Sequence, residues 1–389
     1  MINDPTDVAA DAVAPPPATA PLAPHGSVPV PAPVERLQFT GKAGEYFGIW
    51  IVNLFLTIVT LGIYSAWAKV RKKRYFYGNT WIAGANFEYH GNPIAILKGR
   101  ILAFGAFAAY TLGAQFSPRI AGLVALAFMP ALPWLLVRSF AFNAVNSSYR
   151  NLRFHFNATY RDAAVAIGPA VLFPLLAVIL PQVQPGTKPT PAQMMYAFTP
   201  LAVLWLVYPY LVGKTRLLHV NHSRYGTAPF SCTARIASFY KIYILATLLS
   251  IPLMLFFVVA GVAVVFAPTV GIALLPVAYI LFGASLFGYT QSRLGNLIFN
   301  ATTLDGRLRF GSHLKARKLA GIFGTNILAV LFTLGLAIPW ATIRTLRYRA
   351  ECAEVHADEG LESFLADVAV QVGATGEAMG EMFDVDLSL

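Results

Sequence analysis

The sequence predicts an all-α polytopic membrane protein built from internal repeats, with small cytoplasmic β-hairpins. Three observations favour this class. Hydrophobic side chains make up 57% of the 389 residues and charged side chains only 12%, whereas ordinary soluble domains carry about 25% charged residues. Several apolar stretches approach or exceed the roughly 18 to 20 residues that a helix needs to cross a bilayer. One pattern, an apolar segment followed by basic residues and a β-prone stretch, also recurs along the chain.

Composition divides the chain into three regions. Residues 1–34 are rich in Ala, Pro, Val and Asp, a composition that cannot bury enough apolar area to fold, so we expect a disordered tail. Residues 35–349 are predicted to form the repeat-built membrane domain. Residues 350–389 carry many acids and no Lys or Arg, which indicates an acidic, partly helical cytoplasmic tail.

The first apolar segment runs from Phe47 to Trp67, and Asn79–Tyr89 reads as two short strands around a turn. Six full spans are expected after it, near Ile101–Phe116, Ile120–Val137, Ala163–Leu180, Met194–Val212, Ile242–Val265 and Val270–Tyr289. A clear hairpin, NATTLDGRLRF, follows the last span, with Asp305 and Gly306 at a two-residue turn.

The last apolar segment, Ile322–Trp340, repeats the first one. TLGLAIPWATIRTLRY near the end of the chain matches TLGIYSAWAKVRKKRY near its beginning. Four phenylalanines mark intervening copies at a spacing of roughly 65 to 80 residues, and we expect them to share one cytoplasmic cluster. These are Phe87, Phe154, Phe230 and Phe310.

Two topologies follow from the terminal apolar segments. If both are re-entrant, the protein has six full spans and its termini lie inside; if both cross, it has eight spans and its termini lie outside. Of the 29 Lys and Arg residues, only Arg119 and Lys188 fall in the expected outer connections. This distribution follows the positive-inside rule and favours the re-entrant alternative.

The blocks FTGKAGEYFGIW, NLFLTIVTLGIYSAWAKVRKKRYFYGNT and FEYHGNP resemble the YjgN family of bacterial inner-membrane proteins, a domain of unknown function. The resemblance covers nearly everything after the proline-rich tail, and Phe39–Pro93 is its most specific part. It implies a multi-pass protein of the bacterial inner membrane. It brings no reaction, ligand or catalytic residue to this sequence.

No enzyme is predicted, because the sequence contains no nucleophile arrangement, metal motif or phosphate-binding glycine loop that rises above background, and no cofactor is expected. His219 and His222, with His155 or His313, give the best local case for a metal. Interfacial histidines are the favoured interpretation, since a zinc site needs a third ligand and supporting groups. Nucleic acid is not expected as a partner, because aromatic nucleic-acid motifs are absent and a basic face here favours lipid.

Two functions remain open. Prolines within the spans and internal repeats favour a transporter or channel for a small molecule or ion. A belt of Lys and Arg, with no acid in the middle of a span, favours the alternative of a lipid-binding or membrane-organising protein whose partners are anionic headgroups. The residues predicted to contact headgroups are Arg71, Lys72, Lys73, Arg74, Arg216 and Lys318.

Overall fold

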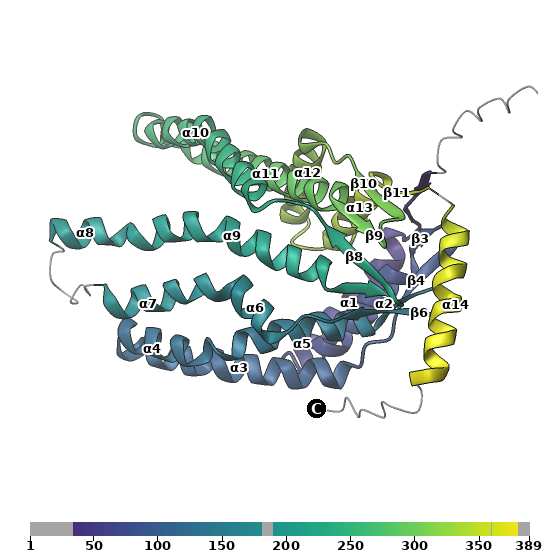
Figure 1. Ribbon diagram of the computed structural model, residues 1–389. Coiled ribbons are helices and arrows are strands. Elements are labelled where there is room, and N and C mark those ends of the chain that lie inside the picture. Colours follow the sequence, from purple (N-terminus) through teal and green to yellow (C-terminus); the bar gives the residue numbers. More distant parts are fainter. Residues whose placement is uncertain (1–33, 181–189, 359, 380–389) are drawn as a thin grey trace, which may run out of the picture.

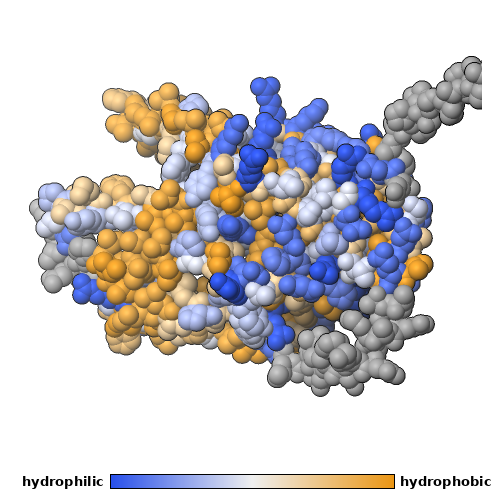
Figure 2. Space-filling view, in the orientation of Figure 1, coloured by the Kyte–Doolittle hydropathy of each residue, from blue (hydrophilic) through white to orange (hydrophobic). Residues whose placement is uncertain are grey.

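The computed structural model describes residues 34–180, 190–358 and 360–379. Except for Val34, the tail predicted to be disordered lies outside these residues. Figure 1 shows long helices extending from one side of a β-sheet and a single helix covering its other side. Apolar side chains gather over the helical half, and hydrophilic ones gather around the sheet (Figure 2).

The short strands of all the repeats pair into one antiparallel sheet of 11 strands, and most neighbours in this sheet are also neighbours in the chain. The strands are β1 (Val34–Arg36), β2 (Gln38–Phe39), β3 (Thr80–Ile82), β4 (Ala85–Tyr89), β5 (Ser147–Tyr149), β6 (Leu152–Phe156), β7 (Ser223–Tyr225), β8 (Ala228–Cys232), β9 (Thr302–Leu304), β10 (Leu308–Ser312) and β11 (Ala353–Ala357).

The first strand segment closes this sheet on itself. β1 pairs with β11 and β2 pairs with β3, although only Leu37 separates β1 from β2. The Leu37 amide itself donates to the carbonyl oxygen of Ala353 at 3.1 Å. Both edges therefore belong to one stretch of chain, and the sheet approaches a closed barrel, which hides its edges from further pairing.

The predicted all-α class with small cytoplasmic β-hairpins is therefore wrong, because the β structure is one sheet of 11 strands that nearly closes into a barrel. Local β propensity identifies each hairpin, but a lone two-stranded hairpin is only marginally stable. Stability comes from pairing between hairpins, as where Phe87 of β4 lies opposite Tyr149 of β5. These partners are many tens of residues apart in the chain, and the alternation of apolar and polar residues within each hairpin does not indicate which other hairpin it pairs with.

The expected phenylalanine cluster is confirmed. Phe87, Phe154, Phe230 and Phe310 all pack against one hydrophobic core inside the sheet. The ring of Phe230 has its centroid 6.4 Å from that of Phe154 and 5.9 Å from that of Phe310. Alternate strand residues point to the same face, so each phenylalanine reaches the same interior from its own hairpin.

The helices form a ring on one side of the sheet, which closes where α13 contacts α1; between α3 and α9 the order in the ring departs from the order in the chain, because α4 packs against α7. They are α1 (Ala43–Val59), α2 (Ser65–Gly78), α3 (Pro93–Phe116), α4 (Pro118–Phe128), α5 (Ala131–Val145), α6 (Tyr160–Ile167), the 3-10 turn η1 (Gly168–Val171), α7 (Leu172–Ile179), α8 (Pro191–Ala197), α9 (Thr199–Asn221), α10 (Ile236–Phe266), α11 (Pro268–Asn300), α12 (Ala316–Phe332) and α13 (Ile338–Glu351). α14 (Leu361–Met379) lies apart from them, against the sheet.

Among the described residues, five helical segments are long and apolar enough to cross a membrane, or six if α4 and α5 count as one span. The expected count of six full spans is thus corrected at Ile120–Val137, where α4 and α5 are bent by 53°. Pro130 lies at this break. Proline has no N–H to donate to the preceding turn, and its ring disrupts a continuous helix there.

The terminal apolar segments form two helical hairpins, α1–α2 and α12–α13, which leave the sheet and return to it. Each turns at a Leu-Gly pair with positive φ, at Leu61–Gly62 and Leu334–Gly335. The 17 residues of α12 span about 26 Å, which is less than the ~30 Å hydrocarbon core. Neither hairpin carries the chain to the far end of the helix ring.

The residues expected to form an acidic tail supply β11 and α14 to the fold. Phe364 and Val368 of α14 are fully buried against the sheet interior. Three ion pairs join this C-terminal segment to basic residues of the hairpins: Arg150–Glu362, Arg307–Asp367 and Arg309–Asp358. The acids after residue 350 therefore neutralise part of the basic sheet.

Acid is expected to loosen α14. Both guanidinium nitrogens of Arg150 donate to Glu362 at 2.6 Å, and these bonds lower the pKa of Glu362 below its ordinary value. A lowered carboxyl pKa adds stability above the unfolded-state value and loses it as the pH falls through the folded-state pKa. Hydrogen exchange should show residues 361–372 losing protection below about pH 4 before β4 and β5 do. Glu362→Gln should show the weaker protection at neutral pH, and unchanged protection in this variant would contradict the role of the pair.

Candidate anion-binding groove

The two helical hairpins have the same internal contacts. Arg71 Nη1 donates to Asn53 Oδ1 at 3.4 Å in the first hairpin, and Arg344 Nη1 donates to Asn326 Oδ1 at 3.2 Å in the second. Both asparagines are buried, where a hydrogen-bond partner is needed to offset the loss of water. The repeat seen in the sequence therefore corresponds to one structural unit used twice.

A groove of about 720 Å³ lies between the start of α1 and the helices α12 and α13. Four basic residues line it, Lys42, Lys318, Arg344 and Arg347, whereas Glu351 is the one acid among the lining residues. Trp340, Thr325 and Tyr348 contribute to its walls. The balance of charge makes the groove suited to an anion.

Neutral groups hold the two arginines of the groove in place. Arg344 donates to Thr325 Oγ1 at 2.6 Å and lies 5.1 Å from the ring centroid of Trp340. Arg347 donates to the carbonyl oxygen of Gly41 at 3.2 Å, which ties α13 to the start of α1. These contacts orient the guanidinium groups and leave their charge uncompensated.

Lys318 completes the basic wall from α12. Its Nζ lies 4.5 Å from the ring centroid of Tyr348, whose hydroxyl accepts a hydrogen bond from the Lys315 amide at 2.9 Å. Among the described residues, Lys318, Arg344 and Arg347 form no ion pair with an acid. A bound anion would therefore meet three positive charges that no ion pair neutralises, and Glu351 is the one carboxylate among the residues that line the groove.

The groove lies between the apolar tip of the α12–α13 hairpin and the sheet. Leu334 at the hairpin tip is 94% exposed, as an apolar side chain in contact with lipid would be. Trp340 lies in the first turn of α13, and Arg344 and Arg347 follow it about one and two turns closer to the sheet. Tryptophan favours the membrane interface, and cations beyond it lie near the headgroups.

The first hairpin has the same scaffold with a different charge. Glu45 stands at the position that Lys318 occupies in the second hairpin. It lies 3.6 Å from Lys42 Nζ and accepts a hydrogen bond from the Tyr75 hydroxyl at 3.1 Å. The first hairpin therefore carries the acid Glu45 where the second carries the cation Lys318, so the first hairpin is less suited to binding an anion.

The residues predicted to contact headgroups do not form one site. Lys318 lines the groove, and Arg71 and Arg74 are the repeat counterparts of its arginines. Lys72 Nζ lies 5.7 Å from the Phe76 ring centroid, and Arg216 is on α9, away from the groove lining.

Lys73 points toward α5 and not toward the groove. Its Nζ donates to Asn143 Oδ1 on α5 and lies 4.5 Å from the Tyr89 ring centroid. Burial, with a smaller effect of Lys69, lowers the pKa of Lys73 to about 8. The structure thus brings Lys318 together with Lys42, Arg344 and Arg347. These last three residues were not predicted from the sequence. The repeated Trp, Arg, Arg and Tyr of the two terminal segments could have identified Arg344 and Arg347 as the counterparts of Arg71 and Arg74.

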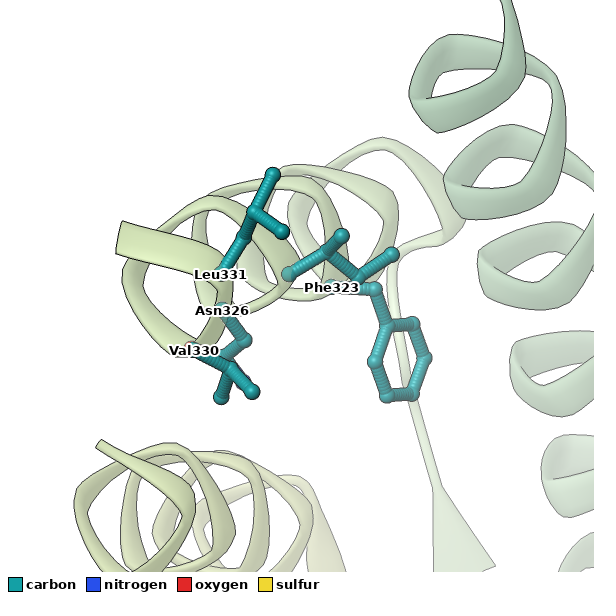
Figure 3. A pocket seen from close by; sticks show the side chains of 5 residues that line it. Phe323, Asn326, Val330 and Leu331 are labelled. Atoms are coloured by element: carbon teal, nitrogen blue, oxygen red, sulfur yellow. The ribbon is translucent and has the colours of Figure 1, made fainter. Parts of the chain in front are cut away.

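A second cavity, of about 340 Å³, lies against another face of α12 (Figure 3). Phe323, Ile327, Val330 and Leu331 give it an apolar lining. The remaining lining residue, Asn326, is satisfied by Arg344, Thr345 and the Ala341 carbonyl. This cavity suits a hydrocarbon chain better than a polar solute.

The histidines weighed as metal ligands have other partners. The ring of His219 packs against Phe140 with centroids 4.5 Å apart, and His222 lies 3.5 Å from Asp162. His313 lies 3.6 Å from Glu354, and burial lowers the pKa of His155. Within the described residues, no group of three or more His, Cys, Asp or Glu side chains could hold a metal ion.

Comparison with known proteins gives consistent matches. The family described as bacterial protein of unknown function (DUF898) matches residues 34–382. The inner membrane protein YjgN of Salmonella typhimurium is 25% identical over 353 residues, which cover 83% of this chain and 88% of that protein. YjgN of Escherichia coli O157:H7 is 31% identical over 132 residues, or 33% of each chain. No solved structure matches.

The family match and the apolar helices agree with the resemblance noted from the N-terminal blocks. The relatives are inner membrane proteins by name, and the described helices include five that could cross a membrane. This is a multi-pass protein of the bacterial inner membrane. Since the match spans all the described residues, the chain belongs to the DUF898 family of bacterial proteins of unknown function.

Proposed function

We propose that this protein binds anionic phospholipids, with the headgroup in the groove between α1, α12 and α13. The observation that carries this proposal is the set of unpaired cations Lys318, Arg344 and Arg347 around a cavity of about 720 Å³ at the base of an apolar hairpin. By the positive-inside rule, the groove would face the cytoplasmic leaflet.

The chemistry of the groove fits a phosphate. A guanidinium group offers a planar pair of N–H donors that matches two phosphate oxygens, and such charge-assisted bonds are stronger than neutral ones. Arg344 and Arg347 are already oriented by Thr325 and by the Gly41 carbonyl. A headgroup would therefore meet donors whose conformational freedom is already restricted, which reduces the entropic cost of binding.

The surroundings of the groove fit the rest of a lipid. The tip of the α12–α13 hairpin presents Phe332 and Leu334 as exposed apolar side chains. The apolar cavity beside Phe323 offers a further contact for an acyl chain. A lipid whose headgroup lies in the groove and whose acyl chain lies in the apolar cavity would be a bound partner of the protein, in a membrane-organising role. Transport or channel activity stays a prediction from the proline-containing helices.

Replacing both groove arginines is expected to abolish the lipid preference. Native mass spectrometry of the full chain released from detergent would count bound phosphatidylglycerol against phosphatidylcholine. We expect the wild type to retain phosphatidylglycerol preferentially and the double variant Arg344→Gln, Arg347→Gln to bind it about tenfold more weakly, equivalent to about 1.4 kcal/mol. The reason is the loss of two charge-assisted donors to the phosphate.

The chain supplies a matched control for this experiment. Arg71→Gln with Arg74→Gln removes the equivalent arginines from the first hairpin, including the equivalent bond to a buried asparagine, and should leave the preference intact. Lys318→Glu copies the charge of the first hairpin at Glu45 and should weaken binding. Equal losses in both double variants, or no lipid preference in the wild type, would contradict the proposal.

A further inference from the structure

The groove between α1, α12 and α13 carries more positive charge than one phosphodiester neutralises. Among the described residues, Lys318, Arg344 and Arg347 form no ion pair, whereas Lys42 has an acidic partner 3.6 Å away. Glu351 is the one acid in the lining. Three unpaired cations and one carboxylate leave a surplus of two positive charges. The headgroup of phosphatidylglycerol, a single phosphodiester, would neutralise only half of this surplus.

The unpaired cations are also spread along the groove. Arg344 donates to Thr325 Oγ1 at 2.6 Å, and Lys318 lies with its Nζ 4.5 Å from the ring centroid of Tyr348. Thr325 and Lys318 are seven residues apart on α12, which is about 10 Å along a helix axis. While these contacts hold the two cations at separate places, one phosphate does not bind both of them. Two phosphates joined by a short bridge can do so.

The groove has room for such a headgroup. Its volume of about 720 Å³ falls within the range of about 300–1,000 Å³ that is typical of pockets holding a whole small molecule. Arg347 follows Arg344 by about one helical turn, and its bond to the Gly41 carbonyl at 3.2 Å holds it toward α1. The two arginines can therefore share one phosphate, and Lys318 remains for a second.

Apolar surfaces extend from the groove on both of its sides. Since α1 and α13 are in contact, the α1–α2 hairpin lies beside the α12–α13 hairpin. Leu61 at the tip of the first hairpin and Leu334 at the tip of the second are each 94% exposed. A headgroup in the groove would thus have an apolar hairpin on either side, as a lipid with two diacylglycerol units requires.

On the basis of the lipid site proposed above, we infer that the groove selects a lipid whose headgroup contains two phosphodiesters joined by a short polar bridge, as in cardiolipin. Arg344 and Arg347 bind one phosphate, and Lys318 binds the other. The two negative charges match the two surplus positive charges of the groove. Basic pockets between membrane helices on the cytoplasmic side are sites of the kind that binds such headgroups.

Competition between lipids on the purified full chain tests this selectivity by native mass spectrometry. One equivalent of cardiolipin is offered against two equivalents of phosphatidylglycerol, which equalises the phosphates and the acyl chains. We expect cardiolipin to be retained with at least tenfold preference. Phosphatidate, whose single phosphate carries about 1.5 to 2 negative charges, should be retained less well than cardiolipin. Equal retention of phosphatidate would show that charge alone selects the lipid and would overturn the inference.

Lys318→Gln is the distinguishing variant. It removes the cation assigned to the second phosphate, so the preference for cardiolipin over phosphatidylglycerol should fall close to one, while phosphatidylglycerol is still retained over phosphatidylcholine. Arg317→Gln removes the same charge from an exposed position of α12 outside the groove lining and should keep the full preference. An unchanged preference in Lys318→Gln would refute the assignment of the second phosphate.

The same competition separates this inference from the proposed function. A wild type that retains phosphatidylglycerol over phosphatidylcholine but shows no preference for cardiolipin would overturn the inference and leave the anionic lipid site standing. A wild type with no preference for any anionic lipid over phosphatidylcholine would overturn both.

Discussion

Phe364→Ala is expected to lower the free energy of unfolding by about 3–5 kcal/mol. Phe364 is 1% exposed and packs with Leu365 and Val368 against the interior of the closed sheet. Truncating the ring leaves a cavity among side chains contributed by several hairpins, so the sheet cannot collapse around it by a local adjustment. The melting temperature of the detergent-solubilised protein should fall strongly.

A lipid-facing phenylalanine provides the control. Phe266 at the end of α10 is 83% exposed, so Phe266→Ala removes a similar ring without creating a cavity. Its melting temperature should stay near that of the wild type. If both variants lose the same stability, α14 does not contribute to the core in the way its burial indicates. Limited proteolysis after residue 358 would separate release of α14 from unfolding of the whole sheet.

Gly288→Ala should destabilise the contact between α11 and α12 by about 1–3 kcal/mol, the usual cost of an overpacked interior. A Cβ at this position would lie 2.6 Å from both the backbone N and the Cα of Ala320. Backbone atoms cannot rotate away as a side chain can, so the helices would have to separate. The melting temperature reports the loss, and α12 is expected to gain protease sensitivity.

The same helix contains a glycine with no such contact. A Cβ at Gly283 would meet nothing within 4 Å. Since alanine is favoured over glycine inside a helix by about 0.5–1 kcal/mol, Gly283→Ala should be neutral or stabilising. The two substitutions are chemically identical and are expected to have opposite signs. A destabilising Gly283→Ala of equal size would show that intrinsic helix effects, and not the approach to Ala320, decide the outcome.

Little of the candidate site could be anticipated from the sequence. Of the six basic residues predicted to contact headgroups, only Lys318 lines the groove. The groove combines Lys318 with Arg344 and Arg347, and with Lys42 from the other end of the chain. Nothing in local sequence indicates that the start of α1 packs beside α13, because that contact follows from closure of the sheet.

The sequence by itself determined what depends on local patterns. Apolar length and the distribution of Lys and Arg indicated a polytopic membrane protein. The repeated Thr-Leu-Gly and Trp-Arg-Arg-Tyr pattern indicated equivalent terminal segments, and the recurring phenylalanines indicated one cluster. The inner membrane followed only from the resemblance of the N-terminal blocks to the YjgN family. Only the tertiary structure decided that the hairpins form a single sheet, that Leu37 joins its two edges, and that residues 353–357 and α14 complete it. The physical reason is that turns, helices and hydrophobic periodicity act over a few residues, whereas strand pairing and convergence of charges join residues that are far apart in the chain.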